Sequence, residues 1–170
     1  ADEFNINKEK AEIAASISKS DLCSDLVNEY PDLQGLMGKY FAISQGFEED
    51  VSNAVSDHYL PLGNNSMPAK KPISYTVAIT DKIDTLVGFF LINEKPTSSK
   101  DPFALRRSAI GLLRTIIDNK LNLKLRNLIS YNIKLFEEQG VKKINENSEN
   151  EILNFLKERM KNILKDKNIK

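Results

Sequence analysis

Apolar side chains recur every three or four residues along most of the chain, which is the spacing of amphipathic helices. Runs that alternate strictly between apolar and polar residues around hairpin turns are missing, so the pattern predicts no strand. The chain is therefore predicted to be all-α, with about seven helices. The predicted helices are Lys8 to Glu29 with a break near Ser18 to Asp21, one that opens at Pro31, Glu48 to Tyr59, Ile73 to Asn93, one that opens at Asp101, Leu121 to Gln139, and one that opens at Ser148.

Residues with capping chemistry mark three of the predicted helix ends. Asp101 followed by Pro102 predicts an N-cap and a first helical residue, because the carboxylate accepts a free backbone N–H and proline has a suitable φ. Ser148 and Glu151 have the spacing of a capping box. Gly140 is a typical C-terminal stop.

Two glycines, Gly35 and Gly38, lie three residues apart within the helix predicted after Pro31. They indicate either a close crossing of two helices or a ligand site. Glycine inside a soluble helix costs about 1 kcal/mol and usually has a packing reason, so the helix crossing is preferred.

The overall composition limits the choice of partners. Lys and Arg number 24 and Asp and Glu number 24, so the formal net charge is zero and the chain as a whole has no basic footprint. Any site for a polyanion must therefore be local. Most of the arginines fall within one short span, between positions 106 and 126. Either a partner requires the planar guanidinium group, whose several N–H donors lysine cannot replace, or these side chains simply lie on solvated helix faces.

Arg106 and Arg107 stand near the start of a predicted helix, where adjacent positive charges oppose the helix macrodipole. Arg106 shares its face with apolar residues, and a partly buried guanidinium must be paired. We therefore expect Arg106 to form an internal ion pair with Asp81 or Asp84. Arg107 lies on the neighbouring face with Arg114, and for these two arginines an external partner is favoured.

Most catalytic signatures are missing from the sequence. It has no phosphate-binding glycine loop, no clustered cysteines and no G-x-S-x-G elbow. The one histidine, His58, has no neighbour in sequence that completes a dyad or triad, so we expect a packed histidine. The one cysteine, Cys23, excludes an internal disulfide, fits a reducing compartment and is expected to be a small buried residue. No catalytic residue is predicted.

The sequence also predicts a soluble, cytoplasmic protein without a membrane span. The first residues are polar and lack the apolar region of a signal peptide. The most apolar run, Ile73 to Ile92, is interrupted by Asp81, Lys82 and Asp84, and central charges argue against a span. The chain begins without methionine and ends in a lysine-rich run, so we expect a segment of a longer protein.

The order of helices resembles that of helical metal-dependent phosphohydrolases of the HD type. In that family the metal site draws on several histidines and an aspartate near the start of a helix. Asp81, in TDKIDTLVG, lies where such domains carry their last metal-binding aspartate, but Glu29 and Tyr30 stand at histidine positions. One histidine cannot build that site, so the resemblance implies an HD-like fold without its metal. A working phosphohydrolase is the least favoured function.

Four long strings closely resemble the beta subunit of bacterial heterotetrameric glycyl-tRNA synthetase, and their order and spacing agree with that family. The resemblance covers Ser18 to about Arg126 strongly, and the later string FLKERMKNIL more weakly. TSSKDP and YPDLQG depart mildly from the family's usual residues. The four strings are SKSDLCSDLVNEYPDLQGLMGKYFA (18–42), DHYLP (57–61), AITDKIDTLVGFF (78–90) and PTSSKDPFALRRSAIGLLR (96–114).

The resemblance implies a degenerate HD-like multi-helix bundle over 1–120 and a helical extension over 121–170 that leads into the next segment of the subunit. In that family the alpha subunit activates glycine with ATP, while the beta subunit binds tRNA and is required for charging it. No ATP site or other cofactor site is therefore expected in this segment. The implied partners are glycine tRNA and the alpha subunit. The alternative is a purely structural helical scaffold.

Residue types suggest how such a segment would meet tRNA. Lys100, Arg107 and Arg114 are the candidate tRNA-binding residues, because cations on phosphates position an RNA without reading its sequence. Arginine also forms bidentate contacts to guanine, and the shallow minor groove of an A-form acceptor stem permits recognition by shape. Arg106, Asp81 and Asp84 are the candidate structural ion pairs. No metal site is predicted.

Overall fold

The fold was analysed in a computed structural model, which describes residues 6–63, 65–142 and 145–166. Every regular element within these ranges is helical, so the all-α prediction is confirmed. The chain divides into two compact units, Ala1–Thr80 (unit 1) and Asp81–Lys170 (unit 2), and helix α5 (Pro72–Leu91) contributes residues to both. The HD-like character and the predicted division near residue 120 stay predictions.

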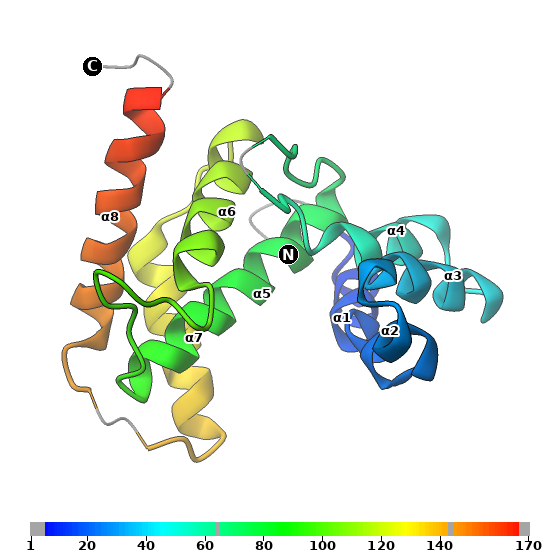
Figure 1. The fold of residues 1–170 in the computed structure, drawn as a ribbon, viewed down its shortest axis with the longest axis horizontal. Helices are drawn as coiled ribbons and strands as arrows, with labels where there is room; N and C mark the ends of the chain where they lie inside the picture. The colour runs from blue at the N-terminus through cyan, green and yellow to red at the C-terminus, as the bar shows by residue number, and fades with distance from the viewer. Residues whose placement is uncertain (1–5, 64, 143–144, 167–170) are drawn as a thin grey trace. The chain divides into compact units, whose positions relative to one another are not determined.

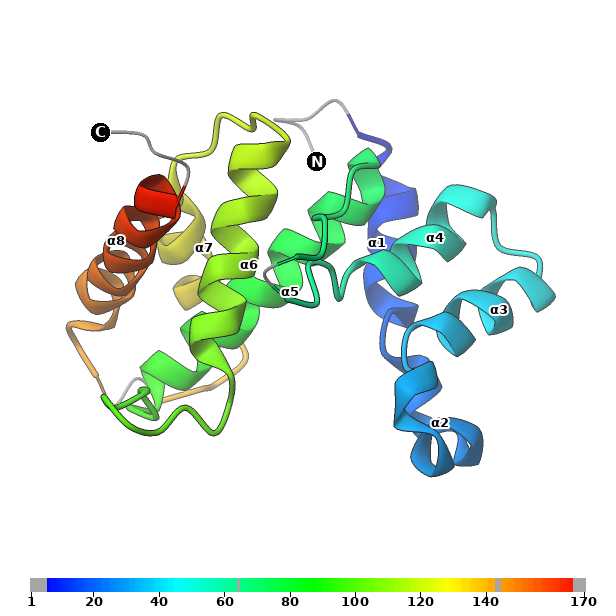
Figure 2. The same cartoon turned by 45° about the horizontal axis from the view of Figure 1, so that its top comes forward.

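Unit 1 is a small helical cluster in which α3 and α1 both pack on α4, as Figures 1 and 2 show. The predicted break near Ser18 to Asp21 is confirmed, since two short helical segments follow α1 there. Besides the start of α5, the elements of unit 1 are α1 (Lys8–Ile17), the 3-10 turn η2 (Ser20–Cys23), α2 (Asp25–Glu29), the 3-10 turn η3 (Pro31–Leu33), α3 (Leu36–Ser44) and α4 (Glu49–Asp57).

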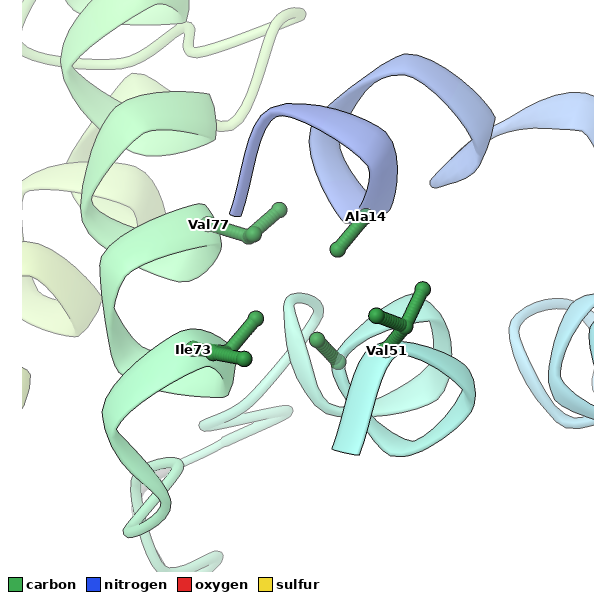
Figure 3. Close-up of a cluster of buried hydrophobic side chains, with 5 residues drawn as sticks. Ala14, Val51, Ile73 and Val77 are labelled. Atoms are coloured by element: carbon green, nitrogen blue, oxygen red, sulfur yellow. The ribbon is translucent and has the colours of Figure 1, made fainter. Parts of the chain in front are cut away.

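The core of unit 1 is built from small and β-branched side chains (Figure 3). Ala14 of α1 and Ala54 of α4 are fully buried, and Val51, Ile73 and Val77 close the cluster. Small side chains at a crossing let two helices approach closely, and close packing is what stabilises such short helices.

A buried carboxylate in η2 fixes the start of α3. Asp21 is 0% exposed, and its Oδ2 accepts hydrogen bonds from the backbone N–H groups of Gly35 at 2.6 Å and Gly38 at 3.2 Å. A Cβ at Gly38 would lie 2.8 Å from Val55 Cγ1, so the predicted packing role of this glycine is confirmed. Gly35 has φ +79°, which favours glycine.

Two expectations in unit 1 are wrong. Pro31 does not open the helix but forms the 3-10 turn η3, and α3 begins at Leu36, because Gly35 turns the chain and Asp21 caps it there. Cys23 is exposed rather than buried, since the turn of η2 that places Asp21 inside leaves Cys23 outside.

Unit 2 is a bundle of longer helices around a larger aliphatic core. It contains the end of α5, α6 (Leu105–Asp118), α7 (Leu125–Glu138) and α8 (Ser148–Asp166). Helix α8 packs against both α6 and α7 (Figures 1 and 2). Each helix contributes large side chains that are essentially inaccessible, namely Leu86, Leu91, Leu105, Leu112, Leu113, Ile129, Ile152 and Leu156.

The helix ends of unit 2 are partly as expected. Gly140, with φ +82°, follows the end of α7, so the predicted stop is confirmed. Ser148 and Glu151 do not form a capping box. The Ser148 hydroxyl is buried without a hydrogen bond to any described residue, and Glu151 instead binds Lys95 and Asn145. Within the described ranges, no helix is long and apolar enough to cross a membrane.

Candidate nucleic-acid interface

The loop before α6 sets the geometry of the candidate site. Asp101 accepts hydrogen bonds from the N–H groups of Leu105 at 2.8 Å and Arg106 at 2.9 Å, so it satisfies two donors at the start of α6. The expected helix start at Pro102 is wrong by three residues. Phe103 stacks on Phe89 with ring centroids 4.0 Å apart. Phe103 therefore belongs to the turn before α6, and the first helical residue is Leu105.

Arg106 is half-buried and bonded within unit 2. One guanidinium nitrogen donates to the Thr97 carbonyl, and another lies 3.8 Å from Asp101 Oδ2. Among the described residues, the carboxylate within ion-pair distance of Arg106 is therefore that of Asp101, where Asp81 or Asp84 was expected. The reason is local, because the loop that caps α6 also brings Asp101 and Thr97 back over its first turn.

Arg107 and Lys100 are exposed cations near the same helix start. Within the described ranges, neither side chain has an ion pair or a hydrogen bond, and the only bonds of Lys100 are through its backbone to Thr97. Their positive charge is therefore available to solvent. Positive charge at this end of a helix is unfavourable for the helix itself.

The remaining predicted residues are engaged within the chain. Arg114 is half-buried on α6, and Asp81 and Asp84 lie on α5. Each of the three residues takes part in at least one interaction within the protein. Asp84 also borders a groove in unit 2 with Gly88 and Phe136. Arg106 and Arg107 therefore lie in the first turn of α6, Lys100 lies in the loop before that helix, and Arg114 lies two turns further along it.

Arg159 on α8 was not predicted from the sequence as part of the site, although α8 packs against α6. Its guanidinium carbon lies 3.8 Å from the centroid of the Phe155 ring on α8. Burial and then the charge of Arg106 lower the pKa of Arg159, while Glu158 and Asp101 oppose that shift. In the sequence, Arg159 lies beside the apolar stripe of a predicted helix and has no other distinguishing feature. Its position near α6 becomes visible only because α8 packs on α6.

Arg126, in contrast, ties two helices of unit 2 together. It donates to Glu149 and, at 3.4 Å, to Asn150, so it links α7 to the first turn of α8. Ser130 Oγ adds a hydrogen bond to Glu149 at 2.8 Å. Because its donors are used within unit 2, we interpret Arg126 as a structural residue and not as a candidate tRNA-binding residue.

The two units differ strongly in charge. Residues 1–80 contain six lysines against twelve Asp and Glu, a formal net charge of −6, and no arginine. Residues 81–170 contain thirteen lysines and five arginines against twelve Asp and Glu, a formal net charge of +6. The neutral total therefore conceals a basic unit, and a basic surface is the usual footprint of a nucleic-acid partner.

The described residues do not include a cluster of the histidine and acidic side chains that a metal-dependent phosphohydrolase would need. His58 is 0% exposed, its Nδ1 lies 2.7 Å from the Val55 carbonyl oxygen, and its ring contacts Tyr59, so the expected packed histidine is confirmed. Within the part of the chain that the structure describes, no three His, Cys, Asp or Glu side chains converge as metal ligands do.

Comparison with known proteins shows the family of the chain. The family model for the glycyl-tRNA synthetase beta subunit matches residues 1–170. The chain is 44% identical to the glycine–tRNA ligase beta subunit of Colwellia psychrerythraea over 99% of its length, 45% identical to that of Rickettsia canadensis over 88%, and 50% identical to that of Paracoccus denitrificans over 69%. It spans 24%, 21% and 17% of these relatives. The chain belongs to the glycyl-tRNA synthetase beta subunit family.

Proposed function

We propose that this segment supports glycyl-tRNA synthesis by binding tRNA through unit 2 and by joining the ligase subunits through unit 1, with no catalytic site of its own. The relatives are named as beta subunits of glycine–tRNA ligase, and the chain covers a quarter of their length or less. Activation of glycine with ATP is assigned to the alpha subunit, and the assembled enzyme works in the cytoplasm.

The observation that carries the tRNA proposal is Arg107, an exposed guanidinium on the basic unit without an acidic partner in the described ranges. Lys100 lies in the preceding loop and is exposed in the same way. Such cations neutralise phosphates and release counterions, which gives affinity that falls with salt. Contacts of this kind fix the position of an RNA without reading its bases, as a segment that presents an acceptor stem to a distant active site requires.

Salt-dependent binding of glycine tRNA to the assembled ligase tests this proposal. The Arg107→Ala, Lys100→Ala double variant should bind tRNA about tenfold more weakly or worse, with a shallower dependence of log affinity on log salt. The matched control is Lys134→Ala, because Lys134 is an exposed lysine of unit 2 whose ammonium already pairs with Glu138 at 3.5 Å. Equal affinity and salt dependence in all three proteins would refute tRNA binding at this surface.

The assembly proposal rests on α3, which is apolar on two sides. Its inner face, with Gly38 and Ala42, is buried, while Leu36, Tyr40 and Ile43 on the outer face are 45%, 55% and 47% exposed. A helix that is apolar all round is normally covered on all sides. The proposed cover is the alpha subunit, with a basic rim that complements the net negative charge of unit 1.

Association of the two subunits tests this second role. The Tyr40→Ala, Ile43→Ala double variant should weaken alpha–beta association at least tenfold in analytical ultracentrifugation, because exposed aromatic and aliphatic side chains at an interface centre carry much of its binding energy. The control Leu62→Ala removes an apolar side chain that is 67% exposed in a loop of the same unit. Unchanged association in the double variant would remove α3 from the subunit interface.

A purely structural scaffold is the competing function, and the same two experiments separate it from the proposal. A scaffold would require the α3 face for assembly and would show no effect of Arg107 and Lys100 on tRNA affinity. That result would keep unit 1 as an assembly module and assign the basic charge of unit 2 to solubility alone.

A further inference from the structure

Unit 2 contains a pocket between the loop that follows α5 and one face of α8. The pocket has a volume of about 310 Å³. Its α8 residues are three or four positions apart, so they lie on one face of that helix. The main lining side chains are those of Phe90 on α5, Lys95 in the loop, and Glu151, Asn154, Phe155 and Glu158 on α8.

The apolar part of this pocket is aromatic. The rings of Phe90 and Phe155 are tilted by 59° with their centroids 5.3 Å apart, an arrangement that aromatic pairs favour. The guanidinium carbon of Arg159 lies 3.8 Å from the centroid of the Phe155 ring. Phe155 is therefore held by two neighbours, and an aromatic ring fixed in this way is a platform on which a flat nucleobase can stack.

The polar part of the pocket offers hydrogen-bond donors and acceptors. Lys95 Nζ lies 2.6 Å from Glu151 Oε2, and this ion pair joins the loop to α8. Among the described residues, the other oxygen of Glu151 accepts no hydrogen bond. The exposed side-chain amide of Asn154 has no hydrogen bond within the same ranges either. An amide both donates and accepts, as the edge of a nucleobase does.

The charges of the lining residues favour a neutral ligand over a phosphate. Glu151 and Glu158 contribute two carboxylates, and Lys95 contributes one ammonium group. A phosphate in this pocket would meet both carboxylates at short range, which is electrostatically unfavourable. A neutral base can instead donate its amino hydrogens to a carboxylate and accept a hydrogen bond from an amide. The expected ligand is therefore flat, neutral and able to donate and accept.

We propose that this pocket binds one unpaired base of tRNA, stacked on Phe155 and hydrogen-bonded to Asn154. The inference rests on the proposed tRNA function, because Lys95 belongs to the same loop as Lys100. The backbone of that loop turns where the Thr97 N–H donates to the Lys100 carbonyl at 2.9 Å. One loop thus carries a cation for the RNA backbone and one wall of a pocket for a base. Proteins read RNA sequence mainly from unpaired bases bound in this way.

The first test is a titration of the assembled ligase with glycine tRNA at several salt concentrations. Asn154→Ala should fold like wild type, because the side chain is exposed and has no hydrogen bond among the described residues. We expect about threefold to tenfold weaker binding with an unchanged log–log salt slope, since the lost contact is a neutral hydrogen bond. The matched control is Asn162→Ala, which removes an exposed amide from α8 outside the pocket and should bind like wild type.

A second pair of variants tests a different occupant, a lysine or arginine side chain of the alpha subunit that pairs with the carboxylates. Asn154→Asp removes the amide donors and adds a third carboxylate to the pocket, while Asn162→Asp adds the same charge outside it. With a base in the pocket, Asn154→Asp weakens tRNA binding more than Asn162→Asp does and leaves subunit association unchanged. Tighter association in Asn154→Asp alone, measured by analytical ultracentrifugation, would assign the pocket to a cationic side chain and overturn the proposal.

Wild-type affinity for tRNA in Asn154→Ala would also overturn the base pocket. The Arg107→Ala, Lys100→Ala double variant separates this failure from failure of the proposed function. Weaker binding with a shallower salt slope in the double variant, together with wild-type binding in Asn154→Ala, would keep tRNA at this surface and remove the base pocket. Wild-type binding in both would contradict both proposals.

Discussion

The two units of this chain have opposite charges and treat their apolar side chains differently. Unit 1 has a net charge of −6, a core of small residues and an apolar helix face in contact with solvent. Unit 2 has a net charge of +6, holds all five arginines and buries large aliphatic side chains from four helices. A chain with zero net charge can therefore carry two different kinds of partner surface, and partners are better inferred for each unit than for the whole.

The largest expected effect is on the free energy of unfolding, when a buried apolar side chain of unit 2 is compared with an exposed one of unit 1. Leu112 on α6 is 0% exposed, so Leu112→Ala should lower the free energy of unfolding by about 2–5 kcal/mol through lost burial and a cavity. Ile43→Ala on the open face of α3 should change it by less than about 0.5 kcal/mol. Urea unfolding followed by circular dichroism measures both. Comparable losses would show that the α3 face is not open to solvent.

The second prediction concerns the buried side chain of Asp21 in unit 1. Asp21→Ala removes the acceptor of two backbone N–H groups and should cost about 2–3 kcal/mol. Asp21→Asn keeps one carbonyl oxygen and should cost less. Unfolding by urea again provides the measurement. A loss below about 0.5 kcal/mol in Asp21→Ala would mean that α3 begins equally well without this cap.

The third prediction divides the arginines of unit 2 by their contacts. Arg106→Ala should lower stability by about 1 kcal/mol, because it loses the bond to Thr97 and the weak pair with Asp101. Arg107→Ala should leave stability unchanged, since its side chain has no partner in the described ranges. Differential scanning fluorimetry of the two variants is sufficient. The reverse order of stabilities would contradict the assignment of Arg106 to the fold.

The smallest expected effect is a pH dependence in unit 2. A hydrogen bond from Lys95 holds the pKa of Glu151 below its usual range. A depressed carboxyl pKa contributes stability that is present above the unfolded-state pKa, near 4.5, and is lost as the pH falls through the folded-state pKa. Glu151→Gln should therefore flatten the acid side of the stability curve slightly. Identical acid profiles for variant and wild type would exclude this contribution.

The sequence predicted the helices well and their ends less well. The stripes along α5, α6, α7 and α8 each have a 3.6-residue period, which a single packed face produces. The start of α6 was misplaced because Asp101 caps it from four residues away, through a loop that Phe103 folds back onto Phe89. Local capping rules assume an adjacent cap and do not include such a loop.

The site was only partly predictable for a related reason. Lys100 and Arg107 were predicted as tRNA contacts from their residue types, and both are exposed, while their role stays a prediction. The neighbours of Arg159 depend on which helices pack together, and no periodicity in the sequence contains that information. The pairing of Asp101 with Arg106 depends on the path of the loop before α6, which a helical period does not describe either. The charge difference between the units was present in the sequence but required the boundary at Thr80 before it could be counted.

The cap of α3 has a consequence for the dynamics of unit 1. The amide protons of Gly35 and Gly38 are held by a carboxylate that solvent does not reach. Their exchange with deuterium therefore requires Asp21 to leave its place, whereas the first amides of an uncapped helix exchange by simple fraying. These two protons, observed by NMR in deuterated water, would measure how often the first turn of α3 opens.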